Sequence, residues 1–130
     1  MSEMTPEEQI TLTRGIMEIL DGWGMSSNQI IDLLALPDKT PTRALRRFRE
    51  NTAFPFSVEV EERIEHIIGI TDALRTSYPH NPHMSNMWIK QRSKKLNNQV
   101  PLQIIIEGGL KGIVEVRQHL DCSYDWHNNP

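Results

Sequence analysis

Residues 26–49 read SSNQIIDLLALPDKTPTRALRRFR, and this stretch predicts two consecutive helices joined by a short turn. Ser26 and Gln29 have the spacing of a capping box, in which each side chain bonds the other residue's backbone N–H at the start of a helix. Thr40 and Pro41 then offer a second cap, with proline at the first helical position. Two helices connected in this way are typical of a helix-turn-helix.

Further helix signals lie on both sides of this stretch. Thr5 and Glu8 form another capping-box pair, and the helix that they open is expected to end at Gly22. Ser57 can cap a long helix whose apolar residues recur at three- and four-residue spacing. Because no convincing alternation with a period of two residues occurs, the predicted fold class is all-α. Three more helical segments are expected at 84–93, 101–105 and 110–120.

The charge of the chain is distributed unevenly. The 130 residues carry a formal net charge of −3, which argues mildly against a non-specific nucleic-acid coat protein. Residues 37–56 nevertheless carry +3 and residues 81–130 carry +2, whereas residues 1–36 and 57–80 carry −5 and −3. The strongest local concentration of cations therefore lies on the second helix of the predicted helix-turn-helix.

This basic helix predicts a contact with operator DNA. In a helix-turn-helix the first turn of the second helix points at base edges, and arginine can hold guanine or clamp phosphate. Two alternatives stay open: a solvated basic face on an ordinary core helix, and a helix-turn-helix retained only for dimerisation. The predicted DNA-binding residues are Lys39, Thr40, Thr42, Arg43, Arg46, Arg47 and Arg49.

The run Tyr78-Pro79-His80-Asn81-Pro82 is the sharpest break in the helical pattern, so a domain boundary is expected there. The predicted organisation is an N-terminal helix-turn-helix domain over 1–78, a small helical domain over 79–124 and a flexible tail over 125–130. The hydrophobic share of 38% is lean, which indicates that part of the apolar surface is buried against a partner. We expect a homodimer.

No motif points to catalysis, a metal or a cofactor. Cys122 is the single cysteine and has no local Cys-His arrangement, while His80 and His83 lack a neighbouring third ligand in the sequence. Phosphate loops and nucleophile elbows are absent from the sequence. The acidic N-terminus does not match a secretory signal, and the longest aliphatic run is far below the ~20 residues that span a bilayer. We expect a cytoplasmic protein that is not an enzyme and does not enter a membrane.

The C-terminal third resembles a known family. The order of its elements is similar to the toxin-binding domain of Xre/MbcA/ParS antitoxins, in which a Trp-Leu pair ends one helix and an Asn- or Gly-containing loop leads to a proline-opened helix. A glycine then precedes a last helix that ends in leucine. With the helix-turn-helix-like stretch, the resemblance covers roughly residues 25–120. The matching residues are Trp88-Ile89, Asn97-Asn98, Pro101, Gly109 and Leu120.

The resemblance implies an antitoxin that neutralises a RES-domain toxin, which acts on NAD or uses it for ADP-ribosylation, and that represses its own operon by binding DNA. Asn97 and Asn98 stand where the family often has glycine, and asparagine tolerates the left-handed conformation better than most residues. The cations near this loop are hypothesised to mimic or cover a phosphate-binding site. The implied toxin-binding residues are Trp88, Lys90, Arg92, Lys94, Lys95, Asn97, Asn98, Gln99, Lys111 and Arg117.

The sequence leaves two alternatives to the antitoxin function. The protein can be a stand-alone helix-turn-helix transcription regulator, with C-terminal helices that serve only dimerisation. A small hydrolase has no motif in its favour. Trp88 lies on an apolar face and is more simply explained as a core residue than as a partner contact.

Overall fold

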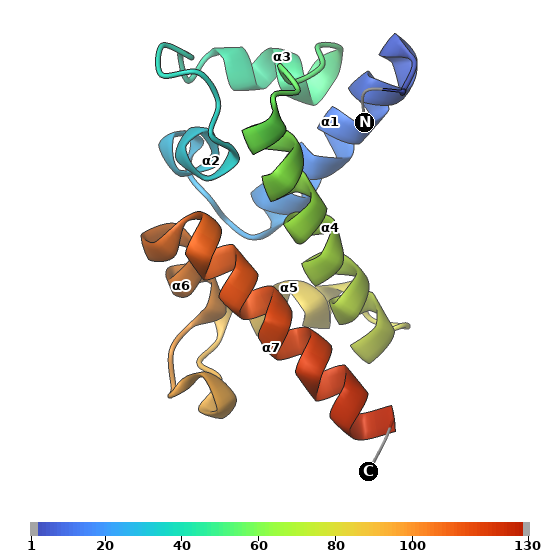
Figure 1. The fold of residues 1–130 in the computed structure, drawn as a ribbon, viewed down its shortest axis with the longest axis vertical. Coiled ribbons are helices and arrows are strands. Elements are labelled where there is room, and N and C mark those ends of the chain that lie inside the picture. The colour runs from blue at the N-terminus through green and yellow to red at the C-terminus, as the bar shows by residue number, and fades with distance from the viewer. Residues whose placement is uncertain (1–2, 129–130) are drawn as a thin grey trace. The chain divides into compact units, whose positions relative to one another are not determined.

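The computed structural model describes the backbone of residues 3–128 and the side chains of residues 3–121, and these residues form helices without any strand (Figure 1). The predicted all-α class is therefore confirmed. The helices are α1 (Pro6–Gly22), α2 (Ser27–Leu34), α3 (Ala44–Glu50), α4 (Val58–Ser77), α5 (Pro82–Lys90), the short 3-10 helix η1 (Lys94–Leu96), α6 (Pro101–Gly108) and α7 (Leu110–Asn128).

The chain divides into two compact units, an N-terminal unit over Met1–Ile64 and a C-terminal unit over Glu65–Pro130. The division lies within α4, so this helix supplies its beginning to one unit and its remainder to the other. The break expected between residues 78 and 79 is present as the end of α4, but it separates two helices of the C-terminal unit. α7 continues to Asn128 and includes most of the segment expected as a tail.

The predicted helix starts are confirmed where the capping groups lie close in sequence. Thr5 Oγ1 accepts the Glu8 backbone N–H at 3.1 Å, and Glu8 Oε1 accepts that of Thr5 at 3.3 Å. Ser26 and Gln29 make the same reciprocal pair at 3.3 and 2.8 Å. The Ser57 hydroxyl likewise accepts a backbone N–H in the first turn of α4. These bonds satisfy amide groups that a helix start leaves without partners.

The start of α3 differs from the prediction. Thr40 and Pro41 do not open this helix, because the Thr40 N–H bonds the Pro37 carbonyl in a turn. Residues 41–46 then form bonds between positions three apart, which is a tighter winding than an α-helix. α3 begins only at Ala44, without a side-chain cap. The connection from α2 therefore spans residues 35–43, whereas a helix-turn-helix turn has about three to four residues.

The N-terminal unit is built around the apolar face of α1. Ile16, Leu20 and Trp23 are buried, and α3 packs against α1. The face is turned slightly from the expected one, since Leu12 and Ile19 are only half-buried while Thr13 and Met17 are fully buried. The Thr13 hydroxyl donates to the Gln9 carbonyl at 2.8 Å and accepts the Phe54 N–H at 3.0 Å. This buried hydroxyl thus ties the segment after α3 to α1.

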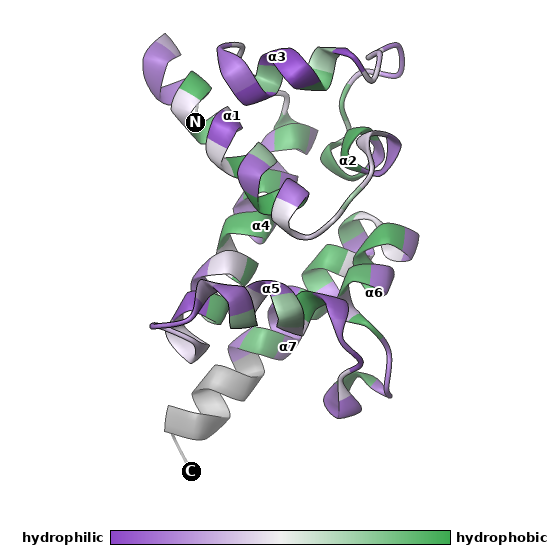
Figure 2. Cartoon of the chain, turned by 180° about the vertical axis from the view of Figure 1, so that it is seen from behind, coloured by the Kyte–Doolittle hydropathy of each residue, from purple (hydrophilic) through white to green (hydrophobic). Residues whose placement is uncertain are grey.

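The C-terminal unit consists of α6 packed between α5 and α7, together with the larger part of α4. Gly109 turns the chain from α6 into α7 with a φ of 57°. A Cβ at Gly112 would collide with the Ile104 carbonyl, so a glycine is required for the close approach of α7 to α6. Figure 2 shows the apolar residues concentrated along α6 and the facing part of α7.

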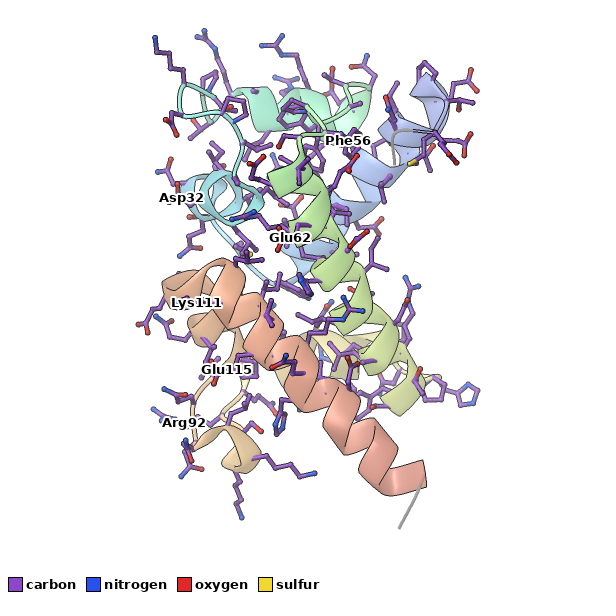
Figure 3. All side chains as sticks on the ribbon, viewed as in Figure 1. Asp32, Phe56, Glu62, Arg92, Lys111 and Glu115 are labelled. Carbon is purple, nitrogen blue, oxygen red and sulfur yellow. The ribbon has the colours of Figure 1, made fainter. Side chains whose placement is uncertain are left out.

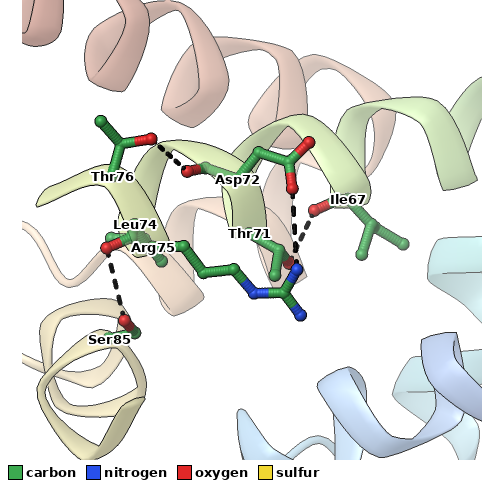
Figure 4. Close-up of polar contacts among 7 residues, drawn as sticks. All are labelled: Ile67, Thr71, Asp72, Leu74, Arg75, Thr76 and Ser85. Carbon is green, nitrogen blue, oxygen red and sulfur yellow. Dashed lines mark hydrogen bonds and ion pairs between the residues drawn. The ribbon is translucent and has the colours of Figure 1, made fainter. Parts of the chain in front are cut away.

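α4 and α5 are joined by a polar contact near the end of α4. The Ser85 hydroxyl donates to the Leu74 carbonyl at 3.5 Å, while Thr71 and Thr76 bond carbonyls one turn back within α4 (Figure 4). α5 begins earlier than predicted, because Asn81 accepts the Met84 N–H as a cap.

None of the helices in the described range is long and apolar enough to cross a membrane.

Candidate functional site

Six of the seven predicted DNA-binding residues, all except Thr40, are exposed on α3 and on the turn before it. They share polar or cationic side chains, and Figure 2 shows the hydrophilic character of this helix. The apolar side of α3 is occupied by Leu45 and Phe48, which are buried. We call the exposed residues other than Arg49 the α3 surface. It consists of Lys39, Thr42, Arg43, Arg46 and Arg47.

Arg49 does not belong to this surface. Its guanidinium group donates from Nε to one oxygen of Asp21 at 2.8 Å and from Nη2 to the other at 2.9 Å. The pKa of Arg49 is raised, mainly because Asp21 accepts these hydrogen bonds. A bidentate pair of this kind fixes the orientation of both side chains. Arg49 therefore joins α3 to α1, while its contact with DNA stays a prediction.

Neighbouring groups limit how far two further predicted residues, Thr40 and Arg46, are free to bind DNA. Thr40 is only half-buried rather than fully exposed, because the turn that begins at Pro37 draws it back. The side chain of Arg46 is 85% exposed and lies 3.4 Å from a carboxylate oxygen of Glu50. An exposed pair separated by one helical turn is weak, so Arg46 is available to a stronger anion such as phosphate.

A second cationic region lies in the C-terminal unit and was hidden in the charge count for residues 81–130. Residues 90–99 contain four Lys or Arg residues and no Asp or Glu. The four are exposed, and none of them is in an ion pair within the part of the chain whose side chains are described. We call this segment the cationic loop. Its cations are Lys90, Arg92, Lys94 and Lys95.

The backbone of the cationic loop closes on itself. The Ser93 N–H donates to the Gln99 carbonyl at 3.0 Å, and the Asn98 N–H donates to the Ser93 carbonyl at 2.8 Å. Asn97 and Asn98 both adopt positive φ angles, 56° and 63°, which asparagine tolerates better than most residues. Leu96 is buried and anchors the loop to its unit. The left-handed conformation expected of the two asparagines is therefore confirmed.

The remaining predicted toxin-binding residues do not gather around this loop. Trp88 is half-buried, and its neighbour Ile89 is the fully buried residue of α5. Lys111 is exposed at the start of α7, and Figure 3 shows it apart from Arg92, with Glu115 between them in that view. The implied site thus separates into the loop, with Asn97, Asn98 and Gln99 exposed beside its cations, and isolated positions elsewhere.

Arg117 is turned toward α4 rather than toward solvent. Its Nη1 atom lies 3.2 Å from His66 Nδ1 and donates to the Glu65 carbonyl at 3.4 Å, while its Nε atom lies 3.8 Å from an Asp121 oxygen. The guanidinium covers Gly69, where a Cβ would collide with it. The side chain is 35% exposed. Arg117 therefore holds α7 against α4, and its expected role in the toxin contact is not favoured by this position.

His119 is a titratable residue near the cationic loop that sequence reasoning missed. It lies half-buried on α7, and its pKa is lowered mainly by burial and additionally by the positive charge of Lys95. Lys95 and His119 are far apart in sequence, so no local motif could have indicated their proximity. The fold thus places the imidazole of His119 beside the cationic loop, and burial favours the neutral form of this imidazole.

In residues 3–121 no three His, Cys, Asp or Glu side chains lie close enough together to hold a metal ion. His80 and His83 are both exposed around the start of α5. Cys122 lies outside the residues whose side chains are described. The described arrangement offers cationic binding surfaces.

In comparisons with protein-family models, with curated proteins and with solved structures, nothing matches this chain.

Proposed function

We propose that the protein is a cytoplasmic, non-enzymatic antitoxin that binds and neutralises a RES-type toxin and represses its own operon as a DNA-binding homodimer. The observation that carries the proposal is the presence of two separate cationic surfaces, one in each unit. The α3 surface lies on the helix expected to contact operator DNA, and the cationic loop lies within the segment that resembles the toxin-binding domain.

The α3 surface supports the part of the proposal that concerns DNA. Arg46 and Arg47 are exposed on α3 and Arg43 is exposed directly before it, and their guanidinium groups suit both guanine edges and phosphate oxygens. Most protein–DNA hydrogen bonds go to phosphates and position the protein on the duplex. The long connection over residues 35–43 departs from a standard helix-turn-helix, so Lys39 and Thr42 would reach DNA from a loop.

The C-terminal unit supports the part that concerns the toxin. Its sequence order resembles the toxin-binding domain of the Xre/MbcA/ParS antitoxins, and its exposed loop displays cations and amides on a backbone closed by hydrogen bonds. A surface of this kind suits recognition of another protein, because fixed polar groups lose little freedom on binding.

Co-expression tests the proposal directly. Expression of the neighbouring reading frame alone should arrest growth, and co-expression with this protein should restore growth and yield a stable complex. A neighbour that is harmless alone and forms no complex would contradict the antitoxin function. Purified protein should also retard DNA from its own promoter, with an affinity that falls steeply as salt rises.

The alternative function is a stand-alone transcription regulator. It is favoured by the α3 surface taken alone, since that surface does not depend on the C-terminal unit. DNA retardation without any toxin complex would support this alternative, whereas a toxin complex without DNA retardation would indicate that the N-terminal unit serves only dimerisation.

A further inference from the structure

We propose that the cationic loop is the part of this protein that docks onto an acidic surface of its toxin partner. The inference rests on the proposed function and deepens it, because it assigns the contact to residues 90–99 and states the chemistry of the surface that they meet. Lys111 and Arg117 are excluded from this contact.

The first argument is the absence of local neutralisation. The loop carries four exposed cations without an acidic residue, and the ion pairs of the described side chains all lie elsewhere. The neighbouring His119 cannot neutralise Lys95, because an imidazole is neutral or cationic and never a carboxylate-like anion. Such a one-signed surface attracts a partner of opposite sign and repels one of like sign.

The second argument is that the loop is already shaped before a partner arrives. The Arg92 Nη1 atom donates to the Asn98 carbonyl at 3.2 Å, which adds a side-chain closure to the backbone bonds between Ser93 and Gln99. Leu96 fixes the loop in the core of its unit. Pre-ordering of this kind reduces the entropy that association costs, so polar contacts made by the loop contribute more to affinity.

The positive charge of the loop also indicates the chemistry of the partner surface. A phosphate-binding site is itself cationic, so a cluster of lysines would be repelled there rather than mimic a phosphate. This argues against the hypothesis that the loop covers such a site. Exposed Asn97, Asn98 and Gln99 both donate and accept hydrogen bonds, which suits the mixture of carboxylates and backbone groups on a protein surface. The cations and amides of the loop together suit an acidic protein surface, and binding of nucleic acid is an alternative outcome of the test below.

The test compares two charge-reversed proteins of equal net charge. Lys94→Glu/Lys95→Glu alters the loop, and Arg14→Glu/Arg75→Glu alters two exposed positions outside it. The affinity of each for the purified toxin of the neighbouring reading frame is measured by calorimetry at two salt concentrations. The loop variant should bind at least about tenfold more weakly than wild type, and the control variant should bind within about threefold of it.

Each outcome separates this inference from the proposed function. If the wild-type protein binds the toxin and both variants bind it equally more weakly, or both bind it as tightly as wild type, the loop contact is overturned. The antitoxin function then still stands. Absence of wild-type binding overturns both. If the loop variant instead keeps its toxin affinity and loses affinity for promoter DNA, the loop binds nucleic acid and the acidic protein surface is wrong. Far-ultraviolet circular dichroism of both variants checks that the helices are retained.

Discussion

The α3 surface and the cationic loop both expose several Lys and Arg side chains, but carboxylates accompany only the first. On α3, Arg49 is held by Asp21 and Arg46 has Glu50 one turn away. In the loop, backbone hydrogen bonds and a buried leucine determine the shape, and the charges remain without described acidic partners. A net charge counted along the sequence overstates the first region and understates the second, because pairing depends on spatial neighbours.

The largest expected effect is a loss of stability in the C-terminal unit, which carries the cationic loop, with the α3 surface unchanged. Gly112→Ala places a Cβ against the Ile104 carbonyl, so α7 must move away from α6. We expect a loss of about 3 kcal/mol in unfolding free energy, at the upper end for an overpacked core, measured by denaturant titration. Toxin binding should fall with it.

Gly108→Ala is the matched control, because a Cβ at Gly108 meets nothing within 4 Å. It should leave stability unchanged or slightly raised, since alanine is the better helix former. Equal loss of stability in both variants would show that the close approach of α7 to α6 is not what requires Gly112.

A second prediction separates the members of the basic α3 region. Arg43→Ala should weaken promoter DNA binding by about 1–3 kcal/mol if Arg43 contacts a base, and Arg46→Ala should behave similarly. Arg49→Ala should instead lower stability by about 1 kcal/mol or less, because its pair with Asp21 is partly exposed. Fluorescence anisotropy and denaturant titration measure the two quantities. A direct DNA defect in Arg49→Ala at full stability would instead support the predicted contact of Arg49 with DNA.

A third prediction concerns the shape of the loop. Asn98 has a φ of 63°, so Asn98→Val forces a β-branched residue into a left-handed conformation at a cost of about 1–2 kcal/mol. Asn98→Gly adopts the same conformation without this steric cost. Thermal unfolding should distinguish the two variants, and their toxin affinities should follow the same order. If Asn98→Val unfolds at the same temperature as Asn98→Gly, the loop is not held in the conformation described.

The smallest expected effect is a pH dependence. The folded protein lowers the pKa of His119, so the unfolded chain binds its proton at a higher pH. The resulting stabilisation is fully present above the ordinary histidine pKa of about 6.5 and is lost as the pH falls from there toward the lower folded pKa. His119→Gln should remove this component, which is about 0.5 kcal/mol or less for a half-exposed side chain.

Denaturant midpoints at about pH 7.5 and about pH 5.5, on either side of the ordinary histidine pKa, measure the difference. His83→Gln is the control, because His83 is exposed near the start of α5. The same loss of stability on acidification in wild type and in His119→Gln would contradict the assignment to this side chain.

Part of the candidate site was predictable from local patterns. The exposed arginines of α3 follow from the alternation with buried Leu45 and Phe48, and the left-handed asparagines follow from the residue type. The density of charge in residues 90–99 was also present in the sequence, but a count over the whole C-terminal third diluted it. The packing of the half-buried Arg117 side chain over Gly69 was not predictable, because it requires α7 to lie along α4.

Local patterns were sufficient for the all-α class and for the starts of α1 and α2, because each capping box closes within four residues of chain. They failed at α3, where a turn from Pro37 competed with the Thr40–Pro41 cap. Which cations are held by partners depends instead on the packing of the helices. Asp21 and Arg49 are 28 positions apart, and their charges meet only when α3 packs on α1. Contacts of that range depend on how helices pack, which no short stretch of sequence encodes.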